Sequence, residues 1–281
     1  MSGAYAFDRL KVSIEDGVAF ATIANPPINL ITMPLFADLA RFGQTVASDD
    51  AIRAVVLRSD DPDFFIAHFD VSAILEFPTD GPAPRGERVE DNVYHAMCET
   101  FRTMPKATIA EINGRVGGGG SELALSCDMR FGAIGKTVIN QPEVAIGILP
   151  GGSGTQRLPR LIGRGRALEV MLGCEDLDAE TAERWGYLNR ALPADELRPF
   201  VTRLAKRIAS FPGKAVADAK ASTLNAEPGF DAGLIEEAHR FQGLIRTPEA
   251  QTLMRRFMER GGQTREEELR LGDLCAEVAK G

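Results

Sequence analysis

Two glutamates and a glycine-rich segment are the residues of this chain best suited to chemistry. Gly117–Gly120 is followed by Ser121 and Glu122, and a second carboxylate, Glu143, follows Pro142. Glycines lack a side chain, so their backbone N–H groups can come close to a ligand. The apolar stretch after Ser121 predicts the start of a helix, whose free N–H groups and dipole favour an anion.

A second backbone donor is expected upstream, where a buried strand ends. Phe64–Ile66 reads as the last part of such a strand, and the turn Ala67–Asp70 follows it. Two N–H donors can stabilise the negative oxygen of an enolate, and two carboxylates can move the protons. Together these residues suit enolate chemistry on a thioester.

Four motifs at these positions resemble those of the crotonase family, the enoyl-CoA hydratase/isomerase superfamily. They stand in the family's order: Ala67-His68-Phe69-Asp70, Gly118-Gly119-Gly120-Ser121-Glu122, Gln141-Pro142-Glu143 and Pro150-Gly151-Gly152-Ser153-Gly154-Thr155-Gln156-Arg157-Leu158. The segment Asn25–Leu30 resembles the family's N-terminal loop that contacts acyl-CoA. The resemblance extends from the first predicted hairpin to Cys174, and more loosely to the C-terminus.

The resemblance implies an enoyl-CoA hydratase, which adds water reversibly and with syn geometry to a 2-enoyl-CoA. The N–H groups of Phe69 and Gly119 would form the oxyanion hole, each contributing about 3 kcal/mol. Glu122 would activate the water and Glu143 would deliver the proton to the α-carbon. Because neighbouring carboxylates do not ionise independently, one of the pair is expected to keep a proton near neutrality.

The resemblance also implies which residues contact the substrate and what else the protein needs. The expected substrate contacts are Pro27, Ile28, Ala67, His68, Phe69, Asp70, Val71, Gly118 and Gly119. No metal and no separate cofactor is expected, since coenzyme A is part of the substrate.

Other interpretations of the same residues stay open. The helix dipole favours a glutamate at Glu122 without any catalytic role, and Glu143 could be an ordinary loop carboxylate. The glycine run could serve only close packing of a helix on a strand. On the same scaffold an isomerase, a thioester hydrolase or a lyase uses the same enolate. A non-catalytic acyl-CoA-binding protein is the alternative of a different class.

Two residues depart from the family pattern, which has glycine and a small residue where this chain has His68 and Phe69. Histidine adopts unusual backbone angles more readily than most residues, so we expect the turn to survive. We interpret His68 as a partly buried polar residue, with a catalytic role as the less favoured alternative. Phe69 is expected at the mouth of the acyl pocket, which leaves the acyl group of the substrate open. Asp70 is expected to cap a helix that begins near Val71.

Composition limits the class of protein. With 281 residues and 44% hydrophobic residues, the chain can bury one substantial core. No apolar run reaches membrane-spanning length and Met1–Ala4 lacks a signal-peptide pattern, so a cytoplasmic protein is expected. The net charge of −8 disfavours a nucleic-acid partner. Its four cysteines are widely spread, which predicts reduced thiols rather than disulfides.

Periodicity predicts an α/β fold, and the resemblance specifies a crotonase-like ββα spiral core. A hairpin is predicted around Asp16-Gly17, and strands alternating with helices follow it. We expect residues 1–195 to form the catalytic core and residues 196–281 a helical region. In the family this helical region packs against neighbouring subunits, so the resemblance implies a homotrimer or a hexamer.

Overall fold

The larger of two β-sheets forms the frame of the fold. A computed structural model describes residues 4–227 and 229–280. Residues 1–3, on which the expectation about a signal peptide partly rests, lie outside the described part. The sheet has the order β1-β2-β3-β5-β7-β10, built from β1 (Leu10–Glu15), β2 (Val18–Ile23), β3 (Ala54–Ser59), β5 (Ala107–Ile112), β7 (Met129–Ala133) and β10 (Arg190–Leu192).

The predicted hairpin and the predicted parallel strands are both present in this sheet. β1 and β2 are antiparallel and are joined at Asp16 and Gly17, whose φ angles are 50° and 78°. Aspartate and glycine tolerate these left-handed angles, which a two-residue hairpin turn needs. The remaining neighbours, from β2 to β10, pair in parallel.

A second, smaller sheet positions the segments that contain the predicted catalytic glutamates and oxyanion amides. It has the order β4-β6-β8-β9, formed by β4 (Phe64–Ile66), β6 (Arg115–Gly117), β8 (Val138–Asn140) and β9 (Leu177–Asp178). β4, β6 and β8 are parallel, so their carboxyl ends lie at one edge of the sheet. The segments that follow these three strands hold all the predicted site residues except Pro27 and Ile28, which follow β2.

Helices of the core pack around the sheets at the spacing that their apolar residues predict. They are α1 (Met33–Ser48), α2 (Val71–Leu75), α3 (Val93–Thr103), α4 (Gly118–Ser126), α5 (Gly154–Ile162), α6 (Arg164–Gly173) and α7 (Ala179–Trp185). The apolar spacing of Val89, Val93 and Met97 indicates a helix from Val89 onward, but α3 begins only at Val93. Asn92 ends the preceding turn and caps α3, because its side-chain oxygen accepts the N–H groups of Tyr94 and His95 at 2.9 and 3.1 Å.

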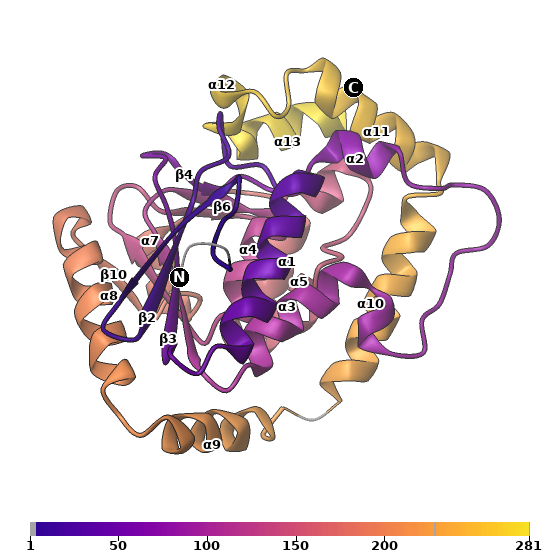
Figure 1. Cartoon of the computed structure of the whole chain (residues 1–281). Coiled ribbons are helices and arrows are strands. Elements are labelled where there is room, and N and C mark those ends of the chain that lie inside the picture. The colour runs from indigo at the N-terminus through magenta and orange to yellow at the C-terminus, as the bar shows by residue number, and fades with distance from the viewer. Residues whose placement is uncertain (1–3, 228, 281) are drawn as a thin grey trace.

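The C-terminal region wraps around the core of its own chain (Figure 1). It consists of α8 (Ala194–Ala209), α9 (Gly213–Leu224), α10 (Phe230–Leu244), α11 (Pro248–Glu259), α12 (Arg265–Glu268) and α13 (Leu271–Lys280). α8 buries Leu197 and Val201 against the larger sheet. α11 and α13 share a hydrophobic cluster with α2 and with the short 3-10 helix η2 (Glu143–Ile146). The predicted role of this region in a trimer or hexamer stays a prediction.

Two expectations from composition can be compared with the structure. All four cysteines are buried free thiols, as predicted. Among the helices of residues 4–227 and 229–280, none is both long and apolar enough to cross a membrane.

Candidate active site

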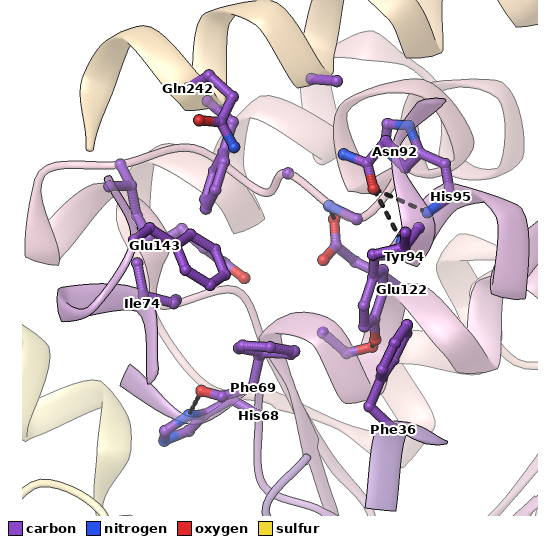
Figure 2. A pocket seen from close by; sticks show the side chains of 18 of the residues that line it. Phe36, His68, Phe69, Ile74, Asn92, Tyr94, His95, Glu122, Glu143 and Gln242 are labelled. Atoms are coloured by element: carbon purple, nitrogen blue, oxygen red, sulfur yellow. Dashed lines mark hydrogen bonds between the residues drawn. The ribbon is translucent and has the colours of Figure 1, made fainter. Parts of the chain in front are cut away.

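Three chain segments meet at the carboxyl edge of the smaller sheet and enclose one cavity (Figure 2). The turn Ala67–Asp70 follows β4, α4 follows β6 directly, and η2 follows β8 after two residues. The cavity has a volume of about 450 Å³, and both Glu122 and Glu143 face it. The structure therefore brings together two carboxylates that are 21 positions apart in the sequence.

The Phe69 amide is free to bind a ligand because of how its turn pairs with the chain around Ile31. Ile31 forms a parallel bridge with Phe69, in which the Ile31 N–H donates to His68 O at 2.8 Å and the Asp70 N–H donates to Ile31 O at 3.1 Å. These bonds use the groups on either side of Phe69, so its own N–H points away from the pairing partner. Among the described residues, the Phe69 N–H has no hydrogen-bond acceptor.

Gly119 supplies a second amide close to the first. It is the second residue of α4, where a backbone N–H has no partner inside the helix. A β-carbon placed on Gly119 would lie 3.5 Å from the Phe69 nitrogen and 3.0 Å from the Tyr94 hydroxyl. The Tyr94 hydroxyl donates to Gly119 O at 2.6 Å and so fixes this peptide. Two main-chain donors therefore lie side by side at the cavity wall.

The next glycine of the run has a packing role. A β-carbon on Gly120 would lie 2.6 Å from Cγ2 of Ile66, a distance that no real side chain accepts. The absence of a side chain lets α4 approach β4 closely. Close packing therefore accounts for Gly120, whereas Gly119 lies at the cavity wall.

Glu122 is held by the glycine-rich segment before α5. Its side chain is buried, and Oε1 accepts the N–H groups of Gly152 and Gly154 at 2.8 and 2.7 Å. A β-carbon on Gly152 would lie 2.5 Å from Oε2, so glycine is required there. Burial raises the pKa of Glu122 well above its ordinary value, and the nearby Glu143 carboxylate raises it further.

Glu143 is the first residue of η2 and is also buried. It lies against Gly118, where a β-carbon would be 2.8 Å from Oε1 and where φ is +43°. Burial raises the pKa of Glu143 to about 7, although the charge of His68 opposes the rise. The two carboxyl groups together therefore retain a proton near neutral pH, as the sequence predicted.

Several aromatic side chains contribute to the remaining wall. The Tyr94 ring stacks on Phe36, with centroids 6.0 Å apart, and meets Phe69 edge to face at 5.9 Å. The segment Phe77–Gly86, which is rich in proline and glycine, closes one side of the cavity, and Phe77 and Pro84 line it. Figure 2 shows Gln242 of α10 on the side opposite Phe69. The wall is suited to an apolar acyl group.

His68 is fully buried rather than partly buried. Its Nε2 lies 2.9 Å from Oε1 of Glu268, and Nδ1 donates to Phe69 O at 2.7 Å. Burial alone lowers the pKa of His68, but the Glu268 carboxylate outweighs burial and raises the pKa to about 9. The Glu268 carboxylate therefore favours the protonated form of His68, and the buried pair ties the turn before α2 to the C-terminal region.

The predicted substrate contacts divide into two groups. His68, Phe69, Val71 and Gly119 line the cavity together with both glutamates. Pro27, Ile28, Ala67, Asp70 and Gly118 do not line it. Ile28 packs on Phe64 and Ala67, and Asp70 caps α2 as expected by accepting the Ser72 N–H at 3.0 Å.

Two residues near the carboxylates were not predicted from the sequence. Tyr94 gave no signal in the sequence, because the apolar spacing of its helix includes its neighbours but not Tyr94 itself. Glu237 carried a usable signal, since it stands on the apolar stripe of α10 between Leu234 and Phe241. A charged residue at such a position is buried only when it has partners.

The chain is similar to a known protein family and to several known proteins. The model of the enoyl-CoA hydratase/isomerase family matches residues 13–267. The crotonyl-CoA hydratase of Syntrophomonas wolfei is 29% identical over 261 residues, which cover 91% of this chain and 96% of that protein. The alpha subunit of the fatty acid oxidation complex of Shewanella baltica is 34% identical over 182 residues, 64% of this chain. The aligned part is only 25% of that longer subunit.

A solved structure extends the likeness to almost every residue. The crystal structure of a protein from Streptomyces avermitilis, provisionally named an enoyl-CoA hydratase, superimposes with a TM-score of 0.87. The two chains are 38% identical, and the superposition covers 98% of this chain and all of the other.

Proposed function

Because the chain belongs to the enoyl-CoA hydratase/isomerase family, we propose that it is an enoyl-CoA hydratase that adds water reversibly to a 2-enoyl-CoA. The observation that carries this proposal is the convergence of two carboxylates and two main-chain amides on one cavity. Hydration needs both a base for the water and an acid for the α-carbon, and Glu122 and Glu143 can supply both functions.

The proposed reaction uses each group once. The thioester oxygen accepts the N–H groups of Phe69 and Gly119, so the β-carbon becomes electrophilic. A water molecule attacks the β-carbon while Glu122 takes a proton from that water. The π electrons of the double bond move toward the thioester to form the enolate. Glu143 then delivers a proton to the α-carbon, which restores the thioester carbonyl. The amides bind the enolate oxygen more tightly than the neutral carbonyl, which lowers the barrier.

The proposed division of roles is supported by the hydrogen bonds to Glu122. Two N–H groups donate to its Oε1, and donors of this kind stabilise the ionised form of a carboxylate. Burial raises the pKa of Glu122 well above its ordinary value and by itself favours a proton on Glu122, whereas the two amide donors oppose this. On the strength of these two donors we assign the negative charge of the coupled pair to Glu122 and the proton to Glu143. An ionised Glu122 suits water activation, and a protonated Glu143 suits proton delivery.

The proposal can be tested with purified protein and enoyl-CoA thioesters of increasing chain length. Loss of the conjugated thioester absorbance, with a 3-hydroxyacyl-CoA product, is expected. Glu122→Gln and Glu143→Gln should each lower kcat by about 10²- to 10⁴-fold while CoA binding persists. Release of free thiol would instead identify a hydrolase, and a shifted double bond an isomerase. CoA binding without any turnover would identify a non-catalytic protein.

A further inference from the structure

A third buried carboxylate, Glu237 of α10, lies next to the proposed catalytic pair. Its side chain is completely buried, and that of its neighbour His95 is too. Oε1 accepts the Ser153 N–H at 2.6 Å and lies 3.1 Å from Nε2 of His95. Oε2 accepts the Thr155 N–H at 2.9 Å and also the Thr155 hydroxyl.

The contacts of Glu237 alternate with those of Glu122 along one short segment. The N–H groups of Gly152 and Gly154 donate to Glu122, whereas those of Ser153 and Thr155 donate to Glu237. Ser153 has a φ of +104°, a left-handed angle that allows successive N–H groups to face different acceptors. Four consecutive amides are thus divided between two carboxylates.

We propose that Glu237 is a positioning residue for Glu122, a role that rests on the proposed hydratase function. Glu237 accepts hydrogen bonds from the Ser153 and Thr155 amides and so fixes this segment. The Gly152 and Gly154 amides therefore point toward Glu122 in a fixed direction. Glu237 itself does not line the cavity and does not touch the reacting atoms. Its effect on catalysis passes through the segment that it holds.

Charge supports this role as well as geometry. After burial and Glu143, the Glu237 carboxylate is the next cause that raises the pKa of Glu122. Removing the charge of Glu237 would therefore change both the direction of the Gly152 and Gly154 amides and the proton affinity of Glu122. Both changes affect the turnover step rather than the binding of the CoA moiety.

The decisive variant is Glu237→Gln, which keeps the size of the side chain but replaces one acceptor oxygen by an NH₂ group. This NH₂ group would face the donors of Ser153 or Thr155. We expect kcat to fall about 10- to 100-fold with KM nearly unchanged, as for a small misplacement of a catalytic group. Amide exchange of Gly152 and Gly154 should become about tenfold faster or more.

Glu111→Gln is the matched control. Glu111 is another buried glutamate, 1% exposed, but it lies on β5 and pairs with Arg198 at 2.9 Å, away from the cavity. The Glu111→Gln substitution should leave kcat and the amide exchange of Gly152 and Gly154 unchanged. If Glu237→Gln does not fold, Thr155→Val removes one donor and should produce a smaller change in the same direction.

The exchange measurement separates failure of this inference from failure of the proposed function. A wild-type protein that hydrates no enoyl-CoA would refute the function, yet exchange at Gly152 and Gly154 would still report on Glu237. Unchanged exchange in Glu237→Gln would overturn the inference whatever the activity. Unchanged kcat in an active enzyme with faster exchange would overturn it too, as would equal losses of kcat in Glu237→Gln and Glu111→Gln.

Discussion

Removing the charge of Glu268 should strongly destabilise the protein, because it leaves His68 without its buried partner. The His68 and Glu268 side chains are 4% and 1% exposed, and Nε2 and Oε1 are 2.9 Å apart. Loss of one member of such a pair costs about 3–5 kcal/mol. The rise in the pKa of His68 from 6.5 to about 9 gives a similar figure, about 3 kcal/mol at about 1.4 kcal/mol per pH unit.

The stabilisation should depend on pH in a defined direction. A raised pKa means that the folded state binds the proton more tightly, so the contribution of His68 is complete below pH 6.5 and is lost as pH rises through about 9. Burial raises the pKa of Glu268, but His68 outweighs burial and lowers it below 4.5, so its contribution is lost in acid. The ion pair therefore stabilises most between pH 4.5 and 6.5.

Urea unfolding of wild type and Glu268→Gln at one protein concentration, at about pH 6 and about pH 9.5, would measure this difference. The variant should lose about 3 kcal/mol at the lower pH and much less at the higher pH. Asp218→Asn is the control, since its pair with Lys214 is exposed and contributes at most about 1 kcal/mol. A loss below about 1 kcal/mol, or an equal loss at both pH values, would refute the reasoning.

Three further predictions concern the site and its packing. The plot of kcat/KM against pH should be bell-shaped and should fall on the alkaline side as Glu143, with a pKa of about 7 in the free protein, loses its proton. A kcat/KM that stays constant from about pH 6 to about pH 9 would contradict this. Gly120→Ala should lower the free energy of unfolding by about 1–3 kcal/mol, because the new β-carbon would collide with Ile66. Gly165→Ala is the control and should not lower it, because the space around Gly165 is open. Thermal unfolding of both variants measures the difference. Tyr94→Phe removes the hydrogen bond from the Tyr94 hydroxyl to Gly119 O and should lower kcat several-fold in steady-state assays. An unchanged kcat would show that the Gly119 peptide does not need this hydrogen bond.

Much of the architecture was predictable because it depends on local patterns. The hairpin at Asp16-Gly17, the helix α1 and the start of α4 each follow from a turn signal or a helical spacing. The likeness to a solved structure confirms the predicted α/β, crotonase-like fold. The start of α3 is harder to predict, since the asparagine cap at Asn92 competes with the apolar spacing that begins at Val89.

The immediate surroundings of the site were less predictable, because they depend on contacts between distant segments. The sequence indicated Glu122, Glu143, Phe69 and Gly119, which line one cavity and all lie within the recognisable motifs. Glu268 is 200 positions from His68, and no periodicity connects the two. Their ion pair becomes visible only when the C-terminal helices are placed on the core.

The wrapping of the C-terminal helices has a consequence for how the protein matures. During synthesis the chain emerges from its N-terminus, so the glutamates of the cavity leave the ribosome well before Glu237 and Glu268. The nascent chain can thus form its sheets before Glu237 and Glu268, which hold the Ser153–Thr155 segment and His68, have been synthesised. The cavity would therefore reach its final geometry only after these last helices dock on the core.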